Sequence, residues 1–179
     1  MFFSIAQRRL TVWHEGMLFK VYEIGIHGKC WRIFWNIYQD MESCVVVNGV
    51  GSRKFKMKRG IRQGSALSAQ LYLIFIDGLL QEVESSKRGA MLTDLTVNIP
   101  TQADDICLVA YKSTDMIDLN DICENYSKLW RFNFSPGKSA AMYLSGKSVR
   151  HNRNSPSFNL FGNEIKKNDC ETCWSNFII

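Results

Sequence analysis

Two adjacent carboxylates, Asp104 and Asp105, are the residues of this sequence whose type and setting best suit chemistry. They lie between two apolar stretches that are expected to form short strands, Leu95–Ile99 and Ile106–Ala110. Like charges repel in such a tight connection, and the Asn and Gly residues that hairpin turns favour are missing. A divalent cation would relieve this repulsion, and Mg²⁺ prefers hard oxygen ligands of this kind. The pair is therefore a candidate metal site, whereas acidic pairs in other loops commonly do no more than solvate a turn.

A basic stretch provides the second candidate site. Residues 53–59 alternate between basic and apolar side chains, which predicts a half-buried strand with a basic outer face. Its cations and those of the following loop are Arg53, Lys54, Lys56, Lys58, Arg59 and Arg62, and Gln63 and Gly64 come next. Lysines on an edge strand commonly prevent edge-to-edge pairing. The functional alternative is a surface that contacts phosphates, with glycine permitting close backbone approach to a ligand.

The elements that must position these residues are helices and strands that interleave along the chain. Apolar spacing predicts helices at residues 15–26, at 29–38, from Ser65 or Ser68 to 83, and at 115–130. The Asn48-Gly49 pair predicts a hairpin between residues 44–47 and 53–59. Further strands are expected at 132–134 and 140–144, and a last hairpin over 158–165 around Gly162-Asn163. This pattern indicates an α+β domain.

Bulk properties restrict the class of protein only loosely. The 179 residues suffice for one domain with a core, and the formal charge of +5 is compatible with an acidic partner such as nucleic acid. Neither a secretory signal nor a membrane span is expected, so we predict an intracellular protein with no membrane partner. The six cysteines are then expected to be reduced, and Cys170 with Cys173 lacks the second ligand pair that a zinc site needs.

Several segments, in their order, resemble the reverse transcriptases of non-LTR retrotransposons. Residues 60–72 are similar to the family's Arg-Gln-Gly motif, which starts the helix under the nascent base pair. Gln102 to Asp105 resembles the aromatic-Ala-Asp-Asp turn, and residues 133–139 resemble the Asn-Pro-x-Lys-Thr element. Residues 11–16 and 44–49 resemble the segments after the first catalytic motif and before the Arg-Gln-Gly loop. Each match is weak alone, but together they cover about residues 3–165 in the right order.

The resemblance implies a fold and a mechanism. The fold would be a polymerase palm, a ferredoxin-like antiparallel sheet backed by helices, and the reaction two-metal nucleotidyl transfer with Mg²⁺ or Mn²⁺. The partners would be an RNA template and a DNA primer. Asp104 and Asp105 would be the catalytic metal ligands. The implied contacts to template or nucleotide are Arg62, Gln63, Gly64 and Lys138, and those to the nucleic-acid backbone are Lys54, Lys56 and Lys58.

One departure from the family affects the metal site directly. Counting back from residues 11–14, the family's first catalytic aspartate falls at Ser4. Serine is neutral and cannot replace a carboxylate between two divalent ions. Gln102 also stands where an aromatic residue is usual, and Ala66 and Ala69 stand where the family has prolines. The third metal ligand is therefore expected to be lost, and with it the polymerase activity.

The expected organisation is a partial palm over residues 1–146, a basic linker over 147–157, and a remnant hairpin with a frayed C-terminus over 158–179. Most of the fingers and the thumb are expected to be absent. Two alternatives to an inactive polymerase fragment stay open. One is a non-catalytic nucleic-acid binder that uses the surface from Arg53 to Arg62, and the other is an unstable fragment of a gene model.

Overall fold

The computed structural model describes residues 2–6, 14–57, 60, 67–102, 104–142 and 157–167. The chain divides into two compact units. The first, here called the sheet unit, comprises Met1–Arg8, Gly78–Leu129 and Asn133–Ile179, and the second, the helical unit, comprises Arg9–Asp77 and Trp130–Phe132. Ser4 and the Asp-Asp pair therefore belong to the sheet unit, and the basic hairpin belongs to the helical unit.

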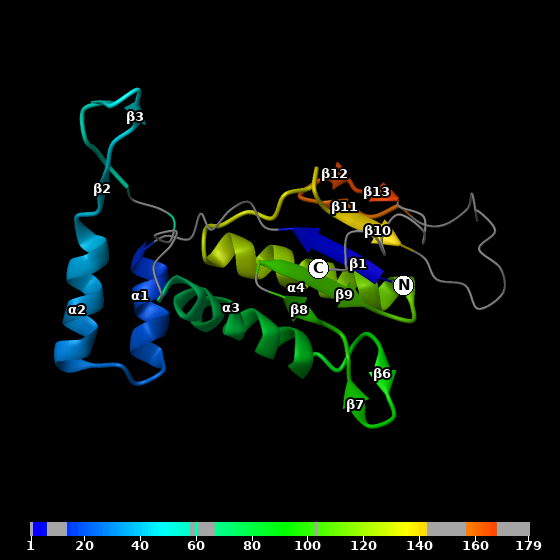
Figure 1. Ribbon diagram of the computed structural model, residues 1–179. Coiled ribbons are helices and arrows are strands. Elements are labelled where there is room, and N and C mark those ends of the chain that lie inside the picture. The colour runs from blue at the N-terminus through cyan, green and yellow to red at the C-terminus, as the bar shows by residue number, and fades with distance from the viewer. Residues whose placement is uncertain are drawn as a thin grey trace. The chain divides into compact units, whose positions relative to one another are not determined.

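In the helical unit, α1 (His14–Glu23) and α2 (Gly28–Gln39) lie side by side (Figure 1). Both helices were predicted, but α1 ends before Ile24, because Gly25 adopts a φ of 92° that turns the chain back toward α2. Met17, Leu18 and Val21 are spaced so that they share one face of α1, and all three are buried. This face forms part of the core of the unit.

A twisted hairpin follows α2. It pairs β2 (Glu42–Ser43) with β5 (Phe55–Lys56) and β3 (Val46–Val47) with β4 (Val50–Gly51). The predicted Asn-Gly turn is confirmed, since Asn48 and Gly49 have φ values of 51° and 80°. The register shifts by one residue between the two pairings, which marks a bulge on the return arm.

The prediction of a half-buried strand at 53–59 is wrong for its described part. Only Phe55 and Lys56 pair as a strand, and the Phe55 side chain is 49% exposed. Val46, Val47 and Val50 are more exposed still, so both faces of this two-stranded ribbon are open. Alternation alone cannot show whether a second layer covers a strand. Residues 58 and 59 lie outside the described residues.

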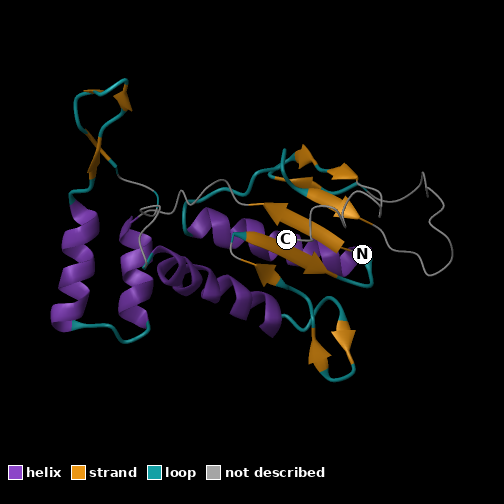
Figure 2. Ribbon diagram, in the orientation of Figure 1, coloured by secondary structure: helices purple, strands orange, loops and turns teal. Residues whose placement is uncertain are grey.

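The main sheet of the sheet unit has five strands in the order β13-β10-β1-β9-β8, drawn with the other strands as orange arrows in Figure 2. They are β1 (Phe2–Ala6), β8 (Thr101–Gln102), β9 (Asp105–Val109), β10 (Ala140–Met142) and β13 (Lys166–Lys167). All neighbours are antiparallel except β10 and β13, which run parallel. Together with α3 (Ser68–Ser85) and α4 (Ser113–Leu129) they confirm the predicted α+β class.

Helix α4 packs beside β9. Met116, Leu119 and Cys123 are fully buried on the helix, and Ile106 and Leu108 are buried on the strand. Because side chains alternate along a strand, Asp105 and Cys107 occupy the other face, which is the more exposed one. The core thus holds β9 in place from one side and leaves the Asp-Asp end accessible.

The partner of β9 is not the predicted strand at 95–99. Leu95–Thr96 (β7) instead pairs with Met91–Leu92 (β6) in a separate small hairpin, and Thr101–Gln102 pairs with β9. The turn between β6 and β7 has Thr93 at a φ of 55°, a conformation that its residue type does not reveal. Backbone pairing with β9 begins only later, where Val109 N donates to the Asn98 carbonyl oxygen at 2.9 Å.

Asn98 and Gly89 fix the loop that leads into the Asp-Asp hairpin. The buried Asn98 side chain donates through Nδ2 to the carbonyl oxygens of Val83 and Arg88, at 2.9 Å and 3.0 Å. Gly89 has a φ of 101°, and a Cβ there would lie 2.6 Å from the Val109 carbonyl oxygen. Only glycine fits this approach of loop and strand.

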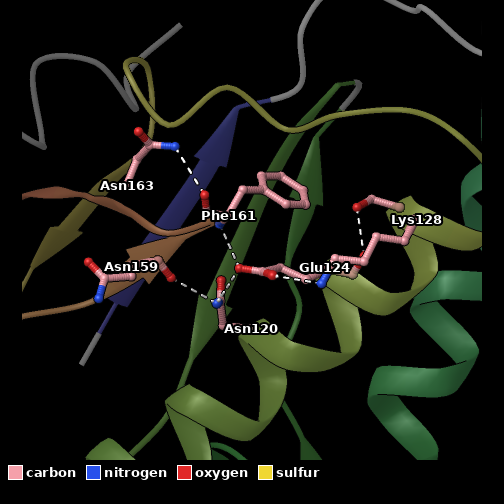
Figure 3. Close-up of polar contacts among 7 residues, drawn as sticks. Asn120, Glu124, Lys128, Asn159, Phe161 and Asn163 are labelled. Carbon is pink, nitrogen blue, oxygen red and sulfur yellow. Dashed lines mark hydrogen bonds and ion pairs between the residues drawn. The ribbon is translucent and has the colours of Figure 1, made fainter.

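The C-terminal hairpin of β11 (Asn159–Leu160) and β12 (Asn163–Glu164) is held on α4 by polar contacts (Figure 3). The Phe161 backbone N donates to Glu124 Oε1 at 2.7 Å, and Asn120 Nδ2 donates to the Asn159 carbonyl oxygen at 3.1 Å. The turn is at Phe161 and Gly162, one residue earlier than predicted. Leu160 and Phe158 are buried beneath it.

The remaining predictions have mixed outcomes. Of the strand expected at 132–134, only an isolated bridge at Phe134 forms, and the described part of the strand at 140–144 is β10. No disulfide joins the four cysteines in the described part of the chain.

No helix among the described residues is long and apolar enough to cross a membrane. The linker expected at 147–157 lies almost wholly outside the described residues, as does the Cys170–Cys173 pair.

Candidate functional site

The Asp-Asp pair sits at the tip of the β8–β9 hairpin. Gln102 is the Cα partner of Asp105, so only two residues separate the two strands. Asp104 lies in the turn and Asp105 begins β9, and both are exposed. The tight connection forms without the Asn-Gly sequence that hairpins favour. This arrangement keeps two carboxylates close together at one end of the sheet.

Strand β1 brings position 4 next to this pair. Ala6 is the Cα partner of Asp105, and Ser4 is the partner of Cys107. Cβ atoms of diagonal neighbours in antiparallel strands lie about 7–8 Å apart or somewhat less. Two aspartates at such positions could therefore share one cation. The position that the resemblance aligned with the family's first catalytic aspartate thus lies on the strand beside the Asp-Asp pair.

Lys138 lies at the same end of the sheet, but in the turn before β10. It is exposed in the turn that precedes β10, and β10 begins at Ala140, the Cα partner of Ser4. Since β1 runs from this point toward Ala6 and Asp105, the turn lies at the Asp-Asp end. The buried Ser139 hydroxyl holds the turn by donating to the Ser135 carbonyl oxygen at 2.8 Å.

The possible metal ligands at the Asp-Asp end of the sheet suit one cation better than two. Two exposed carboxylates, with water or phosphate filling the other positions, suffice for a hydrated Mg²⁺ or Mn²⁺ ion. In the part of the chain that the structure describes, no group of three or more acidic, Cys or His residues could hold a metal ion. A two-ion centre needs carboxylates from both strands. The residues present do not fit that second ion, because β1 carries Ser4 beside the pair.

The basic hairpin contributes cations that already have acidic neighbours. Lys54 Nζ lies 3.9 Å from Glu42 Oε2, and Lys56 Nζ lies 3.2 Å from Asp40 Oδ1. Both pairs are exposed, so they stabilise the hairpin little. Lys58, Arg62, Gln63 and Gly64, the other predicted contacts to nucleic acid, lie outside the described residues.

Two positioning residues were missed by sequence reasoning. Gly89 could have been noticed as a lone glycine soon after a predicted helix, where a positive φ is common. Nothing in the sequence indicates the positioning role of Asn98, because a single asparagine in an apolar stretch does not show whether its amide is buried. Both act on the loop that sets the approach of β8 to β9 rather than on a ligand.

Comparisons with known proteins identify the family of the chain. Residues 10–167 match the family model described as reverse transcriptase (RNA-dependent DNA polymerase). The chain is 28% identical over 160 residues to the Retrovirus-related Pol polyprotein from type-1 retrotransposable element R2 of Popillia japonica, covering 87% of this chain and 26% of that protein. It is 26% identical over 146 residues to the RNA-directed DNA polymerase from mobile element jockey of Drosophila funebris, covering 78% of this chain and 15% of that protein.

The chain therefore spans about a quarter or less of the length of these two relatives. The family match nevertheless covers most of the chain and includes the Asp-Asp hairpin, α4 and β10. On this basis the chain belongs to the reverse transcriptase family, as the reverse transcriptase domain of a non-LTR retrotransposon.

Proposed function

We propose that the chain is a palm segment of reverse-transcriptase ancestry that binds one hydrated divalent cation at Asp104 and Asp105 and does not catalyse nucleotidyl transfer. The palm segment would extend over residues 1–146. The observation that carries the proposal is the pairing of β1 with β9, which sets Ser4 beside the Asp-Asp pair. The ancestral nucleic-acid partners would be an RNA template and a primer.

The chemical reason is charge. Two-ion catalysis activates the primer hydroxyl with one cation and holds the triphosphate with the other, and the two ions lie about 4 Å apart. Anionic ligands must offset their mutual repulsion. Asp104 and Asp105 supply two negative charges from one strand end, and a serine on the neighbouring strand supplies none. A single ion, completed by water, remains compatible with this donor set.

Lys138 would then serve as a phosphate contact at the same corner. A lysine ammonium is a point charge on a flexible stem, which suits a contact to a phosphate without fixed geometry. Its turn lies at the Asp-Asp end of the sheet. Phosphate bound there would complete the coordination of a cation held by the two aspartates.

Primer extension on an RNA template with Mn²⁺ tests the proposal. The chain is compared with Ser4→Asp and with the double variant Asp104→Asn/Asp105→Asn. We expect no extension by the native chain, and extension by Ser4→Asp alone would identify the missing carboxylate as the defect. Extension by the native chain that the double variant loses would show a working polymerase and overturn the proposal. If none of the three chains extends the primer, the result supports inactivity. A measurement of Mn²⁺ binding then shows whether the two aspartates hold an ion.

The second function considered, nucleic-acid binding through the basic hairpin, stays a prediction. The acidic neighbours of Lys54 and Lys56 give these lysines an ordinary structural role. No contact among the described residues specifically favours phosphate there.

A further inference from the structure

The Asn48-Gly49 turn brings together two groups that can react with each other. No other asparagine in the sequence is followed by glycine. Both residues are exposed, and their positive φ values of 51° and 80° close the two-residue turn between β3 and β4. The Asn48 side-chain amide is therefore next in the chain to a backbone nitrogen that no side chain shields.

The chemistry that this pair permits is an intramolecular attack, which proximity favours. Gly49 N gives its proton to hydroxide and forms a bond to Asn48 Cγ. The bond from Cγ to the side-chain nitrogen breaks, and this nitrogen takes a proton from water and leaves as ammonia. Water then adds to the resulting five-membered cyclic imide and breaks one of its two C–N bonds. Aspartate forms when the bond to Cγ breaks, and isoaspartate forms when the bond to the backbone carbonyl carbon breaks. No group is oxidised or reduced.

The nitrogen of Gly49 is accessible in the structure. A Cβ built on Gly49 would meet nothing within 4 Å. Among the described residues, neither the Gly49 N–H nor the Asn48 side chain forms a hydrogen bond. The nucleophile and the amide that it attacks are thus both available.

The ribbon that carries the turn is short and uncovered. Strands β3 and β4 have two residues each, and the side chains of Val46, Val47 and Val50 are 63%, 62% and 74% exposed. A two-stranded ribbon without a covering layer is marginally stable, so the turn opens locally at little cost in free energy. Each opening frees the Asn48 side chain to rotate toward Gly49 N.

Two other asparagines provide references within the same chain. Asn98 is buried, its Nδ2 donates to two backbone carbonyl oxygens, and isoleucine follows it. Asn163 is exposed like Asn48, but glutamate follows it. Burial and hydrogen bonds hold the first amide in place, and the side chain of the next residue hinders attack on the second.

We propose that Asn48 is a site of spontaneous covalent modification in the folded chain, at which Gly49 N and water convert the asparagine into isoaspartate and aspartate. In isoaspartate the backbone runs through the side chain of residue 48 and is one carbon longer. The turn then cannot keep the register that pairs Val46 with Gly51. The new carboxylate also lies in a stretch, residues 44–52, that has no charged side chain. Modification therefore separates β3 from β4.

Ageing of the native chain in water enriched in oxygen-18, at mildly alkaline pH, tests the proposal. Opening of the imide adds a heavy oxygen to residue 48, and mass spectrometry of the digested chain locates it. We expect labelling at Asn48 at least about tenfold faster than at Asn163, and none at Asn98. Isoaspartate, detected with an isoaspartate methyltransferase, identifies the imide as the intermediate, because direct hydrolysis of the amide gives aspartate only.

Variants separate the contributions of the two residues. Gly49→Ala places a Cβ beside the nitrogen and Asn48→Gln lengthens the side chain, so both should lose most of the labelling. Freshly prepared Asn48→Asp carries the charge without the extra backbone carbon, and aspartate tolerates the conformation of the turn. Hydrogen exchange at the Val50 amide should therefore be faster in the aged native chain than in this variant.

The native chain alone decides the outcome. Labelling at Asn48 that is no faster than at Asn163 would overturn the proposal. Labelling of the chain unfolded in urea, with none in the folded chain, would also overturn it, because the turn would then protect Asn48.

Discussion

Ser4 lies directly opposite Cys107 in the antiparallel pairing of β1 with β9, two residues along the strand from the Ala6–Asp105 pair. An aspartate at position 4 would therefore stand one diagonal step from Asp105, within reach of a shared cation. Because position 4 holds a serine, this end of the sheet carries two carboxylates, Asp104 and Asp105, and not three. This relationship is the basis of our proposal that the Asp-Asp hairpin binds one divalent cation and not two.

Gly89 is expected to be the glycine least tolerant of substitution among those described. In Gly89→Ala the new Cβ would meet the Val109 carbonyl oxygen at 2.6 Å and Asn98 Cβ at 2.7 Å, in a backbone conformation with a φ of 101°. Strain and overpacking together should lower the free energy of unfolding by about 2–4 kcal/mol, measured by urea denaturation.

Two matched controls separate the causes. Gly25→Ala shares the positive φ, at 92°, but nothing lies within 4 Å of its Cβ, so it should cost only about 1 kcal/mol. Gly137→Ala has open space and no such φ, and should change stability by less than about 0.5 kcal/mol. Equal effects at Gly89 and Gly25 would show that the contact with Val109 and Asn98 is unimportant.

Glu124 should stabilise the C-terminal hairpin through its contact with the Phe161 backbone N. Glu124→Ala leaves this amide without its charged acceptor, and we expect a loss of about 1.5–3 kcal/mol in the free energy of unfolding. Hydrogen exchange at the Phe161 amide should become faster. Lys128→Ala is the control, because among the described residues Lys128 forms an exposed i, i+4 ion pair with Glu124 at 3.2 Å, whose loss should cost about 0.3–0.5 kcal/mol. Comparable losses in both variants would contradict the role assigned to the Phe161 contact.

Cys123 should be chemically inert in the folded chain. Burial raises the pKa of its thiol far above the usual range, and the nearby carboxylates of Glu82 and Glu124 raise it further. The thiolate is the reactive form, so Cys123 should resist iodoacetamide at pH 8, while the exposed Cys30 and Cys44 are alkylated. Mass spectrometry of the digested chain gives the extent of alkylation at each site. Alkylation of Cys123 as fast as that of Cys30 would show that this core opens readily.

The same shift has a pH consequence for stability. Because the folded chain holds the Cys123 proton more tightly than the unfolded chain does, the contribution of this group is fully present below the unfolded thiol pKa of about 8.5 and falls as the pH rises above it. A Cys123→Ala variant should show a weaker loss of stability between neutral and alkaline pH. An identical alkaline profile in both chains would rule out this linkage.

The sequence predicted the helices and the turn at Asn48-Gly49 well, because periodic apolar residues and an Asn-Gly pair are local signals. It failed at Leu95–Ile99, where the chain uses Leu95 and Thr96 in a hairpin with β6 and Asn98 as an anchor. It also failed at Phe55, whose exposure depends on what covers the strand. Ser4 and the Asp-Asp pair are about a hundred positions apart in the sequence, and only the resemblance to a family suggested that they belong to one site.

Titration of the chain with Mn²⁺, followed by electron paramagnetic resonance, tests the proposed cation site at Asp104 and Asp105 most directly. The native chain should bind one ion with a dissociation constant of about a millimolar, and Ser4→Asp should bind about tenfold more tightly because a third carboxylate joins the site. Asp104→Asn/Asp105→Asn should lose this binding, whereas Asp94→Asn, which removes an exposed carboxylate from the β6–β7 turn, should retain it. Unchanged binding in the Asp104 and Asp105 double variant, or tight binding of two ions by the native chain, would contradict the account.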